Sequence, residues 1–346
     1  MEEDDGHLHR YLLLVPESYD PGRRYPLRVY LHGGTYYPDR GPGGSWWPEV
    51  DLVTSEDHVS LLPLAWDECL WWQNGQIEAL RHMVTSVKRA FNIDDDRVYL
   101  LGVSDGGAGV YFSAMHNPTP WAAYVPMIGN PQVLENPNYA VDGHTYAPNL
   151  RRRHLFIVNT SGDEIHPPTV VASYLRRYEE AGAQFEYREY AGGHDLSWWP
   201  QATGPIDAFL ERHRRNPHPD VVEWVTDRVD RYNRNHWVIV DELGRAGSGP
   251  EARLLASLAD DDGAGVVHAT HQGNTFTIET RGVRRIRLLL SPDEIDFDMP
   301  VRVTVNGRTV FDGPVARDAQ ALLRWAAIDF DRTMLYGAEL EIAVPR

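Results

Sequence analysis

The sequence predicts an α/β fold with a mostly parallel sheet and flanking helices, followed by a smaller all-β domain similar to a β-sandwich. From about residue 10 to residue 217, short apolar runs alternate with helical segments, which is typical of parallel strands joined by crossover helices. From about residue 220 onward, most apolar runs indicate short strands. Because 346 residues exceed what one hydrophobic core usually organises, we expect two domains, residues 1–217 and 220–346.

The first part of the chain repeats the order strand, then helix. The helical period is clear in residues 75–91, where Ile77, Leu80, Val84 and Val87 recur at the spacing of one helix face. Further helices are expected at residues 107–115 and 169–181, and strands at residues 11–15, 27–31, 59–65, 97–102, 122–128, 154–159 and 185–190. In such a sheet, chemically active groups gather at the carboxyl ends of the strands.

The pattern changes at residues 214–219, a charged segment that contains two prolines. After it, strands are expected at residues 237–240, 253–258, 266–269, 275–279, 286–290, 301–305 and 340–344. Asn306 and Gly307 stand between two apolar runs and form a strong signal for a two-residue hairpin. This part of the chain therefore predicts a β-sandwich.

Composition excludes several classes of function. The formal net charge of −17 disfavours nucleic acid or an anionic membrane surface as partner, because phosphate binding needs clustered Lys and Arg. No run of about 18 apolar residues predicts a membrane span. A single cysteine, Cys69, rules out an internal disulfide. The acidic N-terminus does not resemble a signal peptide, but a processed exported chain would look the same, so the compartment and the oligomeric state stay open.

Ser104 lies in the strongest local motif of the chain. Gly-Val-Ser-Asp-Gly at positions 102–106 matches G-x-S-x-G and stands between an expected strand and an expected helix. In that context, the serine occupies a strained turn, and the glycines on either side let backbone and substrate approach it. The pentapeptide alone also fits an ordinary glycine-rich turn, so the assignment of Ser104 as nucleophile needs further support.

Backbone donors for an oxyanion are expected at a second loop. His-Gly-Gly-Thr at positions 32–35 follows the strand at 27–31, where a reaction at Ser104 would need such donors. Gly34 or Thr35 would supply one amide, and Asp105, which follows the nucleophile, the other.

Asp163 and His194 complete a candidate catalytic triad. Asp163 ends the apolar run at 154–159 in a Gly-Asp turn, and His194 follows the strand at 185–190 within a glycine loop. His194 is the expected general base and Asp163 the acid that orients it. The chain order Ser, Asp, His differs from the orders of the chymotrypsin and subtilisin folds. Glu164 and Asp195 remain alternatives for the acid.

With these motifs in place, residues 8–213 resemble α/β-hydrolases related to feruloyl esterases, polyhydroxybutyrate depolymerases and the catalytic domain of prolyl oligopeptidases. The resemblance implies a serine carboxylesterase that cleaves a small, aromatic or polymeric ester through an acyl-enzyme on Ser104. Asp105 departs from the neutral residue that is frequent after the serine, and no propeller domain precedes the core. The alternatives are an oligopeptidase of the same fold and a catalytically inert binding protein.

Aromatic and metal-binding residues give weaker signals. Trp66 and Trp198 stand near strand ends or next to His194, so we expect them to line the substrate pocket, although large aromatic residues more often pack in a core. His7 and His9 form an H-x-H pair without further ligands at a useful spacing. The sequence therefore predicts no metal and no cofactor.

Overall fold

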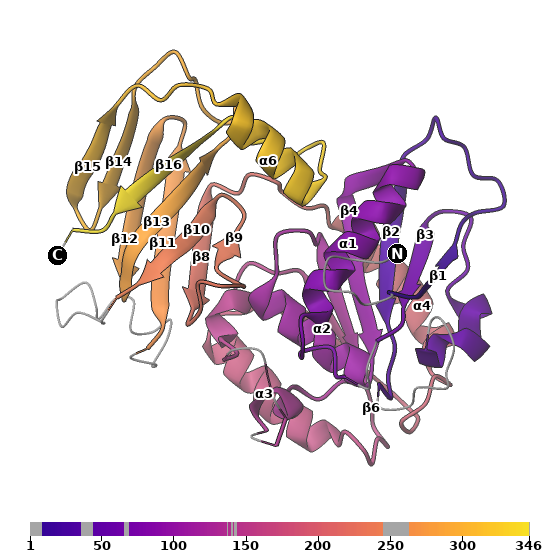
Figure 1. Cartoon of the computed structure of the whole chain (residues 1–346). Coiled ribbons are helices and arrows are strands. Elements are labelled where there is room, and N and C mark those ends of the chain that lie inside the picture. The colour runs from indigo at the N-terminus through magenta and orange to yellow at the C-terminus, as the bar shows by residue number, and fades with distance from the viewer. Residues whose placement is uncertain are drawn as a thin grey trace. The chain divides into compact units, whose positions relative to one another are not determined.

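The computed structural model describes residues 9–35, 44–65, 69–136, 138–139, 141, 144–244 and 263–345. Its contacts divide the chain into two compact units (Figure 1). Unit 1 comprises residues 1–115, 120–145 and 152–215, and unit 2 comprises residues 116–119, 146–151 and 216–346. The strand expected at residues 253–258 lies outside the described residues.

Unit 1 is built on a seven-stranded sheet with the order β1-β3-β2-β4-β5-β6-β7. Among the strands that the structure describes in this sheet, β1 runs antiparallel to its neighbour and the other adjacent pairs are parallel. The strands are β1 (Tyr11–Leu14), β2 (Tyr25–Leu31), β3 (Val59–Pro63), β4 (Ile93–Val103), β5 (Ala123–Met127), β6 (Leu155–Thr160) and β7 (Phe185–Tyr190). All seven strands correspond to runs that the sequence predicts.

The helices of unit 1 are α1 (Gln76–Ala90), α2 (Asp105–His116), α3 (Pro168–Glu180) and α4 (Trp199–Arg212), with 3₁₀ helices η2 (Gly44–Leu52) and η3 (Pro131–Glu135). The sequence prediction missed α4. Its apolar residues pack in one cluster with alternate residues of the central strands, among them Tyr99, Leu101 and Val103. Because side chains alternate along a strand, these residues lie on one face of the sheet, which α4 helps to bury.

Unit 2 contains two sheets. One has the order β16-β13-β10-β9 and the other β15-β14-β12-β11-β8. The strands are β8 (Val221–Thr226), β9 (Arg234–Asn235), β10 (Val238–Leu243), β11 (Gly265–Gln272), β12 (Thr275–Arg281), β13 (Val283–Leu290), β14 (Val301–Val305), β15 (Arg308–Gly313) and β16 (Ala338–Ala343). Side chains from both sheets share one large hydrophobic cluster, so the sheets act as two packed layers.

Two features of unit 2 were not part of the predicted all-β, sandwich-like domain. Strands β12 and β14 pair in parallel, and a helix, α6 (Ala319–Asp329), follows β15. The helix begins at Asp318, whose side chain accepts a hydrogen bond from the amide of Gln320. Between β14 and β15, Asn306 and Gly307 both have positive φ, which is the conformation that the expected two-residue turn requires.

A short segment from the first half of the sequence belongs to unit 2. The 3₁₀ helix η4 (Ala147–Leu150) contacts β8. Asn149 donates to the carbonyl of Val225 and accepts from its amide, each at 2.9 Å. Its side-chain amide thus pairs with β8 in the way that a neighbouring strand would. No described helix is long and apolar enough to cross a membrane.

Burial of His58 gives the fold a testable pH dependence. His58 immediately precedes β3, and burial, with the nearby Arg28 charge, lowers its pKa from 6.5 to about 2. Below pH 6.5 the unfolded chain therefore binds a proton at His58 that the folded chain does not. The free energy of unfolding is thus unaffected by His58 above pH 6.5 and decreases as the pH falls below that value. At pH 5 we expect a loss of about 2 kcal/mol from this group.

Urea unfolding at pH 7 and pH 5 measures this loss. His58→Gln should reduce the difference in unfolding free energy between the two pH values by about 2 kcal/mol. The exposed His82, on α1, is the control, and His82→Gln should keep the wild-type difference. An unchanged difference in His58→Gln would show that His58 is not a buried neutral group.

Candidate active site

Ser104 forms the turn between β4 and α2 and has a left-handed backbone, with φ of 57°. Its amide donates to the carbonyl of Met127 at the end of β5, at 3.0 Å. A non-glycine residue in this conformation costs on the order of 1–3 kcal/mol, and such strain persists only where the surroundings hold it. The strained strand-to-helix turn that the sequence predicts around Ser104 is therefore present.

Glycines around this turn are required by close backbone contacts. A Cβ on Gly106 would lie 2.1 Å from the carbonyl oxygen of Leu31, and one on Gly102 would lie 2.3 Å from the carbonyl oxygen of Gly106. A Cβ on Gly33 would lie 2.7 Å from the Cβ of Ser104. Helix α2 thus starts in direct contact with the end of β2, and the loop after β2 passes beside the serine.

The structure brings Ser104, His194 and Asp163 into one hydrogen-bonded chain. Ser104 Oγ lies 2.8 Å from His194 Nε2, and His194 Nδ1 lies 2.8 Å from Asp163 Oδ2. The carboxylate of Asp163 is almost fully buried, with 1% of its side chain exposed, whereas the His194 side chain is 16% exposed. The imidazole is therefore held from the buried side and reaches the serine at the open side.

Asp163 is also the carboxylate that the surrounding backbone holds in place. Its Oδ1 accepts hydrogen bonds from the amides of Ile165 at 2.9 Å and His166 at 2.7 Å. Of the two alternative acids, Asp195 accepts from the amide of Ser197, and both it and Glu164 are exposed. The nitrogens of His194 instead face Asp163 and Ser104.

His166 is a residue of this site that the sequence analysis missed. Its ring lies edge-on to that of His194, with ring centres 4.9 Å apart, and its Nδ1 donates to the carbonyl of Ile128 at 2.7 Å. Burial lowers the pKa of His166, so the ring is neutral at physiological pH. Its position three residues after Asp163, within the same turn, was the signal available.

The loop for which the sequence predicts an oxyanion donor follows β2, and one of its amides is already engaged. The amide of Thr35 donates to Oδ2 of Asp105 at 3.1 Å. This contact gives a role to the unusual carboxylate after the serine, which ties the loop after β2 to the start of α2. Of the expected donors, Gly34 and the main chain of Asp105 therefore fit an oxyanion better than Thr35.

His32 supports the same loop. Its Nε2 accepts from the amide of Ala65 at 3.0 Å, so its Nδ1 carries the proton and donates to the carbonyl of Gly33 at 2.9 Å. The indole of Trp71 donates to the carbonyl of His32 at 2.8 Å. The histidine of the His-Gly-Gly motif thus orders the backbone beside Ser104.

Of the two tryptophans expected to line a substrate pocket, the structure describes one. Trp66 lies outside the described residues. Trp198 is fully buried, packs in the core under α4, stacks with Tyr190 and donates through its indole to the carbonyl of Asp195. Because the ring has no exposed face, Trp198 holds the His194 loop in place and does not present a surface to a ligand.

Asp163, His166 and His194 each have a possible metal-ligating atom within 4.8 Å of the others. Both nitrogens of His194 are already occupied, one by Asp163 and one by Ser104. A cation here would compete with this hydrogen-bonded chain, so the arrangement suits proton transfer between Ser104 and His194 better than metal binding.

Comparison with known proteins finds similarity to an esterase and to a peptidase at low sequence identity. No protein-family model matches the chain. Over 257 residues the chain is 24% identical to the bifunctional acetylxylan esterase/xylanase XynS20E of Neocallimastix patriciarum. The aligned region covers 71% of this chain and 35% of that protein. Over 141 residues it is 26% identical to dipeptidyl-peptidase 5 of Porphyromonas gingivalis, covering 36% of this chain and 20% of the peptidase. The chain thus spans about a third or less of the length of these relatives.

Among solved structures, an esterase of Thermogutta terrifontis with propionate bound superposes with a TM-score of 0.50. The superposition covers 60% of this chain and 91% of the esterase, at 12% sequence identity. At this identity the likeness shows a shared fold.

The contact between α2 and β2 predicts a stability effect. In Gly106→Ala the new Cβ would overlap the backbone of Leu31, so α2 must shift, and we expect the unfolding free energy to fall by about 1–3 kcal/mol or more. Gly313→Ala, where the nearest atom would lie 3.9 Å away, is the matched control and should stay within about 1 kcal/mol of wild type. Urea denaturation measures both variants. Equal stability of the two would contradict the close contact.

Proposed function

We propose that this chain, whose first unit has the α/β-hydrolase fold, is a serine hydrolase that cleaves carboxylic esters through an acyl-enzyme on Ser104. The observation that carries the proposal is the continuous hydrogen-bonded chain from Ser104 through His194 to Asp163, at 2.8 Å for each step, with the serine on a strained turn. This arrangement supports nucleophilic catalysis by a serine with a histidine base.

In the proposed reaction, Ser104 Oγ attacks the ester carbonyl carbon while His194 Nε2 takes the hydroxyl proton. Asp163 keeps the other proton of the ring on Nδ1 and stabilises the imidazolium. The negative oxygen of the tetrahedral intermediate receives hydrogen bonds from the amides of Gly34 and Asp105. Collapse of the intermediate breaks the bond to the alcohol, which leaves with the proton from His194. A water molecule then attacks the acyl-enzyme while His194 takes its proton. The acid leaves, and His194 returns the proton to Ser104 Oγ.

The coverage of the two relatives supports an ester over a peptide as substrate. The acetylxylan esterase/xylanase aligns with 71% of the chain, whereas the dipeptidyl-peptidase aligns with 36%. Cleavage of a peptide amide is the second candidate, because the peptidase relative and the same triad support it.

We also propose that unit 2 is an auxiliary, β-sandwich-like domain. All residues of the proposed reaction lie in unit 1. The two layers of unit 2 share their own core, which supports a separate fold with a role in stability or in holding the substrate.

Loss of either reacting side chain tests the proposal. Ser104→Ala and His194→Ala should each lower kcat for p-nitrophenyl acetate by on the order of 10⁴-fold or more, because the triad acts as a unit. Ser104→Ala should also abolish labelling by a fluorophosphonate probe. Ser161→Ala removes an exposed serine outside the triad and should behave as wild type.

Activity retained in Ser104→Ala would overturn the assignment of the nucleophile. Labelled wild-type protein that hydrolyses a dipeptidyl p-nitroanilide faster than every ester tested would make the peptidase the first candidate. Absence of labelling in folded wild-type protein would favour the inert binding protein.

A separate comparison identifies the acid. Asp163→Asn should lower kcat by about 10³- to 10⁴-fold, because the amide can leave His194 in the wrong tautomer. The controls are Asp195→Asn and Glu164→Gln, which make the same change at two exposed carboxylates. Their kcat should remain within about threefold of wild type. A larger loss in either control than in Asp163→Asn would mean that the acid is a different carboxylate in solution.

A further inference from the structure

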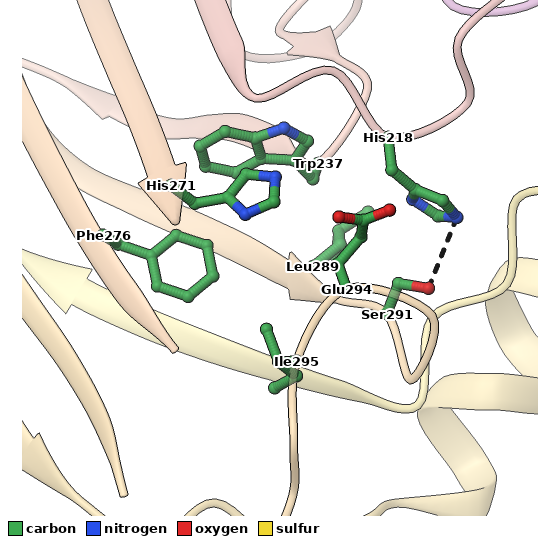
Figure 2. A pocket seen from close by; sticks show the side chains of 8 residues that line it. All are labelled: His218, Trp237, His271, Phe276, Leu289, Ser291, Glu294 and Ile295. Atoms are coloured by element: carbon green, nitrogen blue, oxygen red, sulfur yellow. Dashed lines mark hydrogen bonds between the residues drawn. The ribbon is translucent and has the colours of Figure 1, made fainter. Parts of the chain in front are cut away.

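Unit 2 contains a small hollow that the proposed reaction does not use. It is lined by residues from both sheets and from the turn after β13, among them His218, Trp237, His271 and Glu294, and leaves room for about one water-sized group, about 10 Å³ (Figure 2). In Figure 2 the carboxylate of Glu294 lies between the rings of His271 and His218. A pocket with two imidazoles and a carboxylate calls for a polar occupant.

Three possible metal ligands meet here. Asp220, His271 and Glu294 each offer a ligand atom within 4.8 Å of the others. Asp220 immediately precedes β8, His271 lies near the end of β11, and Glu294 lies in the turn after β13. The amide of His271 donates to the carbonyl of Asp220 at 3.0 Å, and the amide of Glu294 donates to the carbonyl of Ser291 at 3.2 Å. The backbone therefore fixes all three positions before any ligand binds.

The His271 side chain gives a second, independent indication of a ligand. Only 8% of the residue is exposed, and its Nδ1 is buried without a hydrogen bond to any residue that the structure describes. The ring packs edge-on against Trp237, with centres 5.2 Å apart, and stacks with Phe276 at 5.5 Å. A buried imidazole held among aromatic rings, with a nitrogen that lacks a protein partner, is costly unless something else satisfies the ring.

We propose that Asp220, His271 and Glu294 bind a divalent transition-metal ion, with Zn²⁺ as the best match. One imidazole and two carboxylates are donors that zinc accepts, and the imidazole disfavours Ca²⁺ and Mg²⁺, which take oxygen ligands. Tetrahedral zinc with bonds of about 2.0–2.1 Å needs ligand atoms roughly 3.4 Å apart. The exposed Asp220 side chain is free to close the remaining distance, and water completes the coordination.

The surroundings argue against an organic ligand such as a sugar. Trp237 and Phe276 are each only 3% exposed, so neither presents a face on which a sugar ring could stack. Nor does His218 complete the trio, because its Nε2 lies 3.3 Å from the hydroxyl of Ser291. The ion would join the edge of one sheet to the turn that leaves the other, and would stabilise unit 2.

The test is zinc binding by the full chain after chelator treatment. Calorimetric titration with ZnCl₂ compares the wild type with His271→Gln, Glu294→Gln and Asp220→Asn. Each variant should bind one zinc ion fewer than the wild type, or bind that ion with an affinity about 10- to 100-fold lower. Zinc should raise the melting temperature of the wild type more than that of the three variants. His268→Gln, on the same strand but outside the pocket, is the matched control and should keep the wild-type stoichiometry.

The design separates this site from zinc bound near His194, since that binding would persist in all four variants. Asp220→Asn changes an exposed side chain and keeps the test valid if His271→Gln fails to fold. The proposal is overturned if the wild type and the three variants bind the same number of zinc ions with equal affinity, or if His268→Gln loses as much binding as His271→Gln.

Discussion

Helix α2 begins so close to strand β2 that only backbone fits between them. Gly106 lies against the carbonyl of Leu31, and the serine that precedes this contact adopts a left-handed conformation, held by its hydrogen bond to Met127. The sheet register fixes both neighbours, because β4 pairs with β2 on one side and with β5 on the other. The position of Ser104 Oγ thus depends on the packing of three strands and one helix more than on any contact of its own side chain.

Two neutral histidines with fixed tautomers support the residues next to that serine: His32 lies in the loop after β2, and His166 contacts His194. Backbone groups determine the protonated nitrogen of His32 and of His166, because an amide can only donate and a carbonyl can only accept. Both rings are buried, and neither adds a positive charge beside His194. The negative charge of Asp105 is bound by the amide of Thr35. The polarity of the site therefore comes mainly from oriented backbone groups and one buried carboxylate.

Sequence patterns located the strands of unit 1 and the three residues of the hydrogen-bonded chain, because each follows a strand at the same edge of the sheet. They missed helix α4, whose Trp-Pro start and internal Pro205 hide the helical period, and α6, which interrupts a series of strands. Contacts that depend on tertiary packing were also beyond reach. Nothing in the local sequence shows that Asp105 would bind Thr35, that Trp198 would be buried, or that Asp220, His271 and Glu294 would meet.

The pairing of Asn149 with Val225 bears on the order in which the chain acquires its structure. During synthesis, Asn149 leaves the ribosome well before its partner, since 76 positions separate the two residues. Until β8 emerges, the side-chain amide of Asn149 cannot form its two hydrogen bonds to Val225, and unit 2 cannot complete this edge. The late contact has a high sequence separation, so its closure is expected among the slow steps of folding. A nascent chain halted before residue 225 would therefore display residues 146–151 as an unfinished edge, open to chaperones and proteases.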